Sequence, residues 1–234
     1  MSTSKPQTQP QFITLDEPLD YLSWSSRNYS LIKARNPDIY ELKIALIDTI
    51  PSVYRTILIP GDVTLNKLHL VIQNSFNWWN YHLFQFDGHG KSKTIETVFK
   101  NQKELMYEYD FGTTQYHLIK KVKSYKFSEN DAHKVFPVCI GGDRFAPFED
   151  SSDWDNMLEI AQDKKHEEYK ETIDWLKEMW DQTTQGRQGT FNLSRLLDNN
   201  VNLANINLKL SRLQLYPTKE YKEFDIPTSM KNLK

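Results

Sequence analysis

Cysteine is almost absent from this sequence: Cys139 is the single one among 234 residues. One thiol cannot form a disulfide within the chain, and it is too few for a structural zinc site built on cysteines. The sequence therefore suits a reducing compartment, and we expect a cytoplasmic protein. Secretion by a route without a signal peptide stays open. In its Pro-Val-Cys-Ile setting, Cys139 itself is expected to be a buried, inert thiol.

Long apolar runs are also missing. No stretch approaches the ~18 apolar residues that span a bilayer, and residues 1–37 contain no signal-peptide apolar core. We therefore expect no membrane association.

A strong basic excess, the electrostatic signature of nucleic-acid binding, is absent as well. The net charge is −2, with twelve acidic and four basic residues in 149–181 and eight basic and four acidic residues in 182–234. This pattern predicts a solvated acidic helical face and a mildly basic tail. Nucleic acid is a possible partner that the charges do not favour.

Aromatic residues are plentiful, at 13% with six Trp, which argues for a folded core. We divide the chain into an extension (1–37), a main domain (38–198) and a second extension (199–234). Residues 1–11 are typical of a disordered lead-in. The apolar residues within 19–32 are expected to pack on the main domain or on a partner.

Periodicity predicts the elements of the main domain. Alternating apolar residues predict strands at 39–46 and 53–59, and the spacing of Leu65, Leu68, Ile72 and Phe76 predicts a helix capped by Asp62 or Thr64. A short strand at 82–86 and a hairpin of 105–110 with 115–122 follow. Residues 136–142 are interpreted as a loop. Helices are predicted at 153–162, with Ser152 and Asp155 as a capping box, and at 166–180. The 206–215 segment is interpreted as one or two strands.

Several motifs occur in an order that resembles one family. They are Pro51-Ser-Val-Tyr-Arg55, Pro60-Gly-Asp62, Leu68-His69 with Ile72-Gln73 and Trp78, His82-Leu-Phe-Gln-Phe86, Tyr107-Glu-Tyr-Asp110-Phe-Gly112 and a Pro-x-Cys step at Cys139. Residues 38–198 therefore resemble the Ri-plasmid ORF-three-like family, whose members occur on plasmids and as passengers of insertion elements. The resemblance implies a mobile-genetic-element setting and no settled activity.

This chain departs from the family pattern at two places. Thr113, Thr114, Gln115 and Tyr116 stand where relatives read Asp-x-Trp-Glu, and Ala146 and Ser151 stand where many relatives have cysteines. The predicted fold is α+β, with a curved or barrel-like, mainly antiparallel sheet, one inserted helix and an acidic helical pair.

Histidine and aspartate supply the candidate chemistry. Asp110 and His117 flank the predicted hairpin turn, so Asp110 is placed to orient His117 as a general base. If His69 and His82 converge on the same point, the four side chains form a ligand set for a divalent metal. Against this, histidines on apolar faces are commonly hydrogen-bonded core residues, and no HEXXH spacing is present.

Binding residues are predicted in three places. Arg55 shares strand parity with Val53 and Ile57, and is expected to pair with Asp110 or Glu108 inside the sheet. The segment containing Trp78, Trp79 and Tyr81 is suited to core packing and a protein contact. Arg144 ends an Ile-Gly-Gly-Asp-Arg segment that resembles an anion cradle, although no phosphate-loop Lys-Ser/Thr follows.

The leading functional hypothesis is a non-enzymatic binding or regulatory module that contacts a protein partner. The alternative is a metal-dependent or acid–base enzyme built on the His/Asp cluster, and a nucleic-acid-associated protein is third. No cofactor is established by the sequence, and a divalent metal is the candidate.

Overall fold

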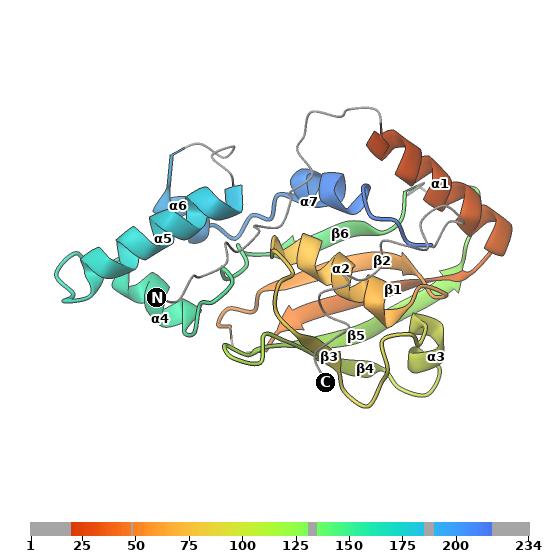
Figure 1. Cartoon of the computed structure of the whole chain (residues 1–234), viewed down its shortest axis with the longest axis horizontal. Coiled ribbons are helices and arrows are strands. Elements are labelled where there is room, and N and C mark those ends of the chain that lie inside the picture. Colours follow the sequence, from red (N-terminus) through yellow and green to blue (C-terminus); the bar gives the residue numbers. More distant parts are fainter. Residues whose placement is uncertain (1–19, 48, 131–134, 185–189, 217–234) are drawn as a thin grey trace, which may run out of the picture.

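An open antiparallel sheet forms the centre of the molecule (Figure 1). The computed structural model describes residues 20–47, 49–130, 135–184 and 190–216. Within these ranges six strands lie in the order β3-β4-β5-β1-β2-β6. Their bounds are β1 Asp38–Leu46, β2 Tyr54–Pro60, β3 Phe84–Phe86, β4 Glu104–Tyr109, β5 Gln115–Lys126 and β6 Val138–Asp143. The predicted α+β class and the antiparallel pairing are confirmed.

The helices lie over the sheet and beyond one end of it (Figure 1). Their bounds are α1 Asp20–Arg35, α2 Leu65–Phe76, α3 Ile95–Phe99, α4 Trp154–Ile160, α5 Tyr169–Thr184, α6 Leu193–Leu196 and α7 Leu203–Leu210. In Figure 1, α4, α5 and α6 gather at the left, away from the strands. In the part of the chain that the structure describes, no helix meets the length and apolarity that a membrane crossing requires.

The inserted helix α2 forms because its caps and its apolar face agree. Thr64 accepts a hydrogen bond from the Lys67 backbone N–H, and Asn77 ends the helix in the left-handed conformation. The predicted face of Leu65, Leu68, Ile72 and Phe76 is buried in the main core. Of the two predicted caps, Asp62 and Thr64, it is Thr64 that caps the helix.

A second, smaller core lies under the acidic helices. Trp180 of α5 is fully buried and stacks on Phe145, while Leu158 of α4 and Leu176 of α5 pack in the same cluster. The predicted helical pair is confirmed. The predicted capping box at Ser152 is wrong, because Asp153 caps α4 and the Asp155 carboxylate accepts the Ile50 N–H instead.

The sheet is not barrel-like, so that part of the fold prediction is wrong. The two edge strands, β3 and β6, do not pair with each other. The backbone of edge strand β6 instead forms hydrogen bonds with a side chain of α7. Asn207 accepts the Cys139 N–H at 2.7 Å and donates to the Cys139 carbonyl at 2.9 Å, as a neighbouring strand would. The prediction of a loop at 136–142 is therefore wrong for residues 138–142, which belong to the edge strand β6.

The predicted strands at 206–215 are also wrong, since residues 203–210 form α7. Ile206 and Leu210 are buried one turn apart, whereas Leu208 is 42% exposed. Alternating apolar residues fit a short helix as well as a strand, and the Asn202 cap decides for the helix here.

The N-terminal apolar segment packs on the main domain through α1. Ile32 is fully buried in the main core. The Asn28 carboxamide donates to the Leu213 carbonyl and accepts the Leu215 N–H. The disorder predicted for residues 1–11 falls outside the described residues.

Candidate functional site: a His–Asp–Asp cluster

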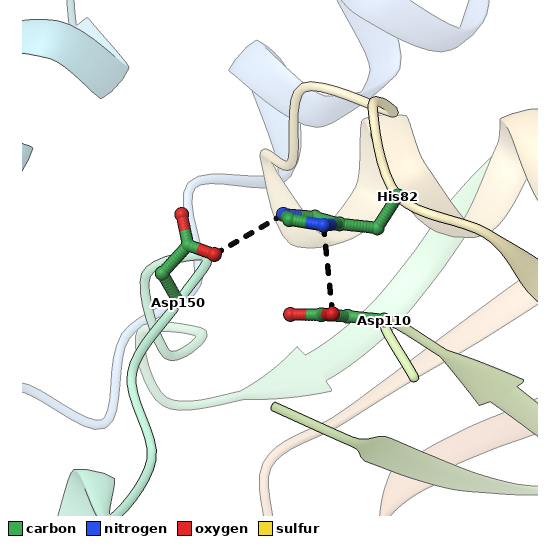
Figure 2. A group of neighbouring side chains, drawn as sticks. All are labelled: His82, Asp110 and Asp150. Atoms are coloured by element: carbon green, nitrogen blue, oxygen red, sulfur yellow. Dashed lines mark ion pairs between the residues drawn. The ribbon is translucent and has the colours of Figure 1, made fainter. Parts of the chain in front are cut away.

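Three side chains from separate segments meet beside the hairpin of β4 and β5 (Figure 2). His82 Nδ1 lies 3.5 Å from Asp110 Oδ1, and His82 Nε2 lies 3.2 Å from Asp150 Oδ1. One ligand atom from each residue lies within 4.8 Å of the others. Figure 2 shows the imidazole nearly edge-on, with Asp150 at one end and Asp110 below it. The cluster is open to solvent on the Asp150 side, whose side chain is 50% exposed.

Asp110 is fixed by the hairpin turn. Its backbone has φ 61°, and its Oδ1 accepts the Gly112 N–H at 3.0 Å. Its own N–H donates to the Leu83 carbonyl, which ties the hairpin to the segment that carries His82. Asp tolerates this left-handed conformation because its short side chain bonds the backbone locally. The turn therefore holds the carboxylate, only 8% exposed, beside the imidazole.

His82 is held by the aromatic segment that follows α2. Trp78 stacks on Tyr109 with ring centroids 5.3 Å apart and donates its indole N–H to the Pro147 carbonyl. The His82 N–H donates to the Tyr109 hydroxyl at 3.3 Å. The alternation predicts a strand that begins at His82, but β3 begins two residues later, at Phe84. His82 therefore lies in the loop before the strand.

A buried carboxylate lies next to the cluster. Glu149 is 5% exposed and accepts hydrogen bonds from the Tyr109 hydroxyl and the Trp79 N–H. Burial raises the pKa of the Glu149 carboxyl, although these two hydrogen bonds act in the opposite direction. Desolvation, with the nearby Glu149 and Asp150 charges, raises the pKa of Tyr81 to about 12. Negative charge thus concentrates around His82, a setting that favours a cation.

The Nε2 atom of His82 is buried, yet within the described residues it has no hydrogen-bond partner. Its 3.2 Å approach to Asp150 is close in distance but does not have the geometry of a hydrogen bond. An imidazole nitrogen that faces a carboxylate without bonding to it retains a lone pair or a proton for a third group.

His69 and His117 do not join this cluster. His69 stacks on Phe84 at 3.5 Å and bonds Tyr107 and Asn80 through its two ring nitrogens. His117 is fully buried, and its Nδ1 lies 3.2 Å from the Gln115 carbonyl. Of the four predicted ligands, the structure brings together His82 and Asp110. Asp110 contacts His82 and not His117, so the predicted acid–base pair is not formed in this geometry.

The predicted binding residues have separate places. Trp78 is 7% exposed and belongs to the main core, Trp79 packs against the second core, and Tyr81 is 47% exposed beside His82. Arg55 is 2% exposed and donates to three backbone carbonyls, those of Tyr54, Ser75 and Asp143. It does not pair with Asp110 or Glu108, which corrects that prediction. Arg144 lies in a cleft with Arg55.

Asp150 is the cluster residue that sequence reasoning missed. It stands in a loop 40 positions after Asp110, where no periodicity places it near a hairpin turn. The available signal was the pair of adjacent acidic residues, Glu149 and Asp150, which follows Pro147 in a loop.

The fold and the cluster define an α+β protein with an open antiparallel sheet and a potential cation site beside one hairpin. The family model described as plasmid pRiA4b ORF-3-like protein matches residues 38–187, and the chain belongs to this family.

Two relatives show how far the similarity extends. The chain is 26% identical over 159 residues to uncharacterized protein y4hQ of Sinorhizobium fredii (strain NBRC 101917 / NGR234), a match that covers 58% of this chain and 80% of that protein. A crystal structure of a protein of unknown function, MM3350 of Methanosarcina mazei Go1, superimposes with a TM-score of 0.54 at 29% identity. That match covers 60% of this chain and 90% of the other. Neither name assigns an activity.

Proposed function

We propose that this protein binds a divalent metal ion through His82, Asp110 and Asp150, and that the ion supports metal-dependent chemistry at the solvent-facing side of the cluster. The observation that carries the proposal is the convergence of three ligand atoms within 4.8 Å from three separate segments. One imidazole and two carboxylates suit Zn²⁺, Mn²⁺ or Fe²⁺.

The spacing is somewhat wider than an ion requires. Two ligand atoms at ~2.0–2.2 Å from a tetrahedral ion lie about 3.3–3.6 Å apart. The ligand atoms lie within 4.8 Å of one another, so the most widely spaced pair closes by up to about 1.5 Å to reach coordinating distance. Asp150 is half exposed and can move that far at little cost.

Three protein ligands leave positions for water or substrate, which is the arrangement of catalytic rather than structural metal sites. A bound ion lowers the pKa of its water and so generates a nucleophile at neutral pH. Glu149 acts as a positioning residue in this proposal, because its carboxylate fixes Tyr109 and the Trp79 backbone on either side of the loop that holds His82.

The test is metal content and metal binding. Protein purified without chelator is analysed for elements, and apo protein is then titrated with Zn²⁺ and Mn²⁺ by calorimetry. We expect about one ion per wild-type chain, and its loss in His82→Ala and Asp110→Asn because each removes one of three ligands. His166→Ala is the matched control, since His166 is exposed and lies on the acidic segment.

Circular dichroism on each variant separates metal loss from unfolding. Wild-type protein that neither retains nor binds an ion would refute the proposal, and so would a folded His82→Ala variant that binds as tightly as wild type. The first of these results would leave His82, Asp110 and Asp150 as a structural contact between three segments of the chain.

A protein partner is the second candidate function, and one observation favours it. Exposed apolar side chains gather in the segments around the cluster, with Tyr81 at 47%, Leu83 at 63% and Phe111 at 48% exposure. The Asp110 N–H donates to the Leu83 carbonyl, and Phe111 follows Asp110 in the chain. This hydrogen bond links the segments that carry Leu83 and Phe111. Such a group is the kind of surface that protein interfaces bury. Replacing Leu83 and Phe111 with Ser would abolish partner binding without changing metal content, which separates the two functions.

Nucleic-acid binding has less support. The lysines of β5 are the densest basic group in a single strand, but Lys120, Lys123 and Lys126 pair with Glu104, Glu41 and Asp38. Paired lysines have less positive potential to offer a phosphate backbone.

A further inference from the structure

A polar cleft on another part of the molecule is lined by more cationic than anionic side chains. Its volume is about 180 Å³, and it lies where β2, β6, the end of α2 and the start of α7 meet. Its lining includes Arg55, Arg144, Asn77 and Asn202. It is smaller than the roughly 300–1,000 Å³ of sites for drug-sized ligands, so it fits a small one.

Arg55 is the central observation. Its side chain is 2% exposed, and its Nε and Nη1 donate to the carbonyls of Ser75, Tyr54 and Asp143. Among the described residues, Arg55 forms no ion pair with a carboxylate, and the hydrogen bonds that it donates come from Nε and Nη1. Burial accordingly lowers the pKa of Arg55 to about 10. The Asp143 carboxylate acts on Arg55 electrostatically without forming a salt bridge. A buried guanidinium without a carboxylate in contact is costly, unless an anion occupies the cleft that it lines.

The backbone is shaped around this arginine. Gly142 of β6 pairs with Arg55 of β2, and a Cβ at Gly142 would lie 3.0 Å from the Arg55 Cδ and 2.8 Å from the Tyr54 carbonyl oxygen. Only glycine at position 142 leaves room for the Arg55 side chain. The pairing of β2 with β6 therefore fixes where the guanidinium lies.

A second, half-buried cation beside the cleft fixes the orientation of the Asn77 carboxamide. Lys209 donates to Asn77 Oδ1 at 2.8 Å, and burial lowers the pKa of Lys209. Since an ammonium group only donates, Asn77 must present its oxygen to Lys209, which leaves its amide N–H groups for the cleft. Asn202 uses its oxygen to cap α7 by accepting the Asn205 N–H, so its amide N–H groups are available in the same way.

Arg144 adds a second guanidinium. Its backbone has φ 60°, its N–H donates to the Asn199 carbonyl, and its side chain makes one long hydrogen bond, 3.4 Å, to the Pro51 carbonyl. Arg195 and Asp198 also line the cleft. Asp198 Oδ1 accepts two hydrogen bonds from Asn200, which direct that oxygen into its own loop.

We propose that this cleft binds a phosphate group, held by Arg55 and Arg144 and by the amide N–H groups of Asn77 and Asn202. Two guanidinium groups without carboxylate partners match the charge of about −1.5 to −2 on a phosphate monoester at neutral pH better than the single charge of a carboxylate. The planar guanidinium groups donate paired hydrogen bonds that match the spacing of phosphate oxygens. The site is separate from the His82 cluster and does not depend on it.

The experiment is calorimetric titration of the full chain with inorganic phosphate, glycerol 3-phosphate and acetate. Chelator is present and the ionic strength is constant, so that a metal at His82 does not contribute. We expect wild type to bind phosphate, and Arg144→Gln to bind it at least about tenfold more weakly, because it loses charged hydrogen bonds. Lys103→Gln is the matched control, since it removes one exposed positive charge away from the cleft and leaves the affinity within about twofold.

The outcomes separate the two sources of phosphate. Tighter binding of glycerol 3-phosphate than of inorganic phosphate supports a phosphorylated metabolite, and equal binding supports free phosphate. No phosphate binding by wild type at up to about 10 mM would overturn the proposal. So would unchanged affinity in a folded Arg144→Gln variant, or acetate binding at least as tight as phosphate. Arg55→Lys, which keeps the charge but loses the fork, should retain weaker binding.

Discussion

Two buried neutral histidines should make this protein sensitive to mild acid. His117 is fully buried among Phe76, Trp78 and Tyr107. Its Nδ1 faces a carbonyl and must carry the proton, so its buried Nε2 is an unprotonated nitrogen without a partner among the described residues. Burial lowers the pKa of His117 to about 3.

His69 is neutral for the same reason, and burial lowers its pKa to about 4. In the unfolded chain both imidazoles titrate near ~6.5. As the pH falls below that value, the unfolded state binds two protons that the folded state does not bind. The free energy of unfolding therefore falls with decreasing pH, from ~6.5 down to the folded pKa values. Full stability from this source is present only above ~6.5.

The magnitude follows from the width of that window. Each pH unit costs about 1.4 kcal/mol per histidine, so between pH 7 and pH 5 each contributes about 2 kcal/mol and the pair about 4 kcal/mol. Because pH 5 lies above both folded pKa values, this result depends little on their exact position. It is a large part of the 5–15 kcal/mol that holds a typical domain folded.

The assay is urea unfolding at pH 7 and pH 5, followed by tryptophan fluorescence, for wild type and His117→Phe. Phe keeps an aromatic ring in the same pocket and cannot titrate. We expect the loss of stability between the two pH values to be about 2 kcal/mol smaller in the variant, whatever its stability at pH 7. His166→Ala, which removes an exposed histidine, should lose as much as wild type. An equal loss in wild type and His117→Phe would refute the reasoning.

Two further predictions concern packing at the β6 edge. Asn207→Ala should destabilise the protein by about 2 kcal/mol or more, because it leaves the Cys139 N–H and carbonyl without partners, and chemical denaturation measures this loss. Leu208→Ala on the exposed side of the same helix should change stability by less than about 0.5 kcal/mol. Gly142→Ala should destabilise by about 1–3 kcal/mol, because the new Cβ lies 3.0 Å from Arg55 Cδ and 2.8 Å from a backbone carbonyl oxygen. A melting temperature equal to wild type would contradict it.

Local pattern predicted the elements that bury one face. The alternation at 39–46 and the helical spacing from Leu65 to Phe76 both appear as predicted, because one side of each element faces the main core. The pattern failed where burial was incomplete, as in the edge strand β6. Val138–Asp143 forms an edge strand that is satisfied by the Asn207 side chain, a partner 68 positions away from Cys139 that no local signal reveals.

The candidate site was predicted in part for the same reason. His82 and Asp110 were singled out from their segments, and the hydrogen bond from the Asp110 N–H to the Leu83 carbonyl brings those segments together. Asp150 was missed, and His69 and His117 were included on the strength of residue type. Their ring nitrogens are engaged within the core, which a sequence alone does not disclose.

The sequence by itself determined the antiparallel α+β class, the inserted helix, the acidic helical pair and the family, because these depend on periodicity and on motifs in a fixed order. Tertiary structure alone decided that the sheet stays open, that residues 203–210 are helical, and which side chains meet. Asp150 joins His82, and Arg55 lines a cleft without forming a salt bridge, through contacts between segments far apart in the chain. The physical reason is that side-chain convergence depends on how loops are anchored, here by Glu149, Tyr109 and Trp78, and such anchoring is not periodic.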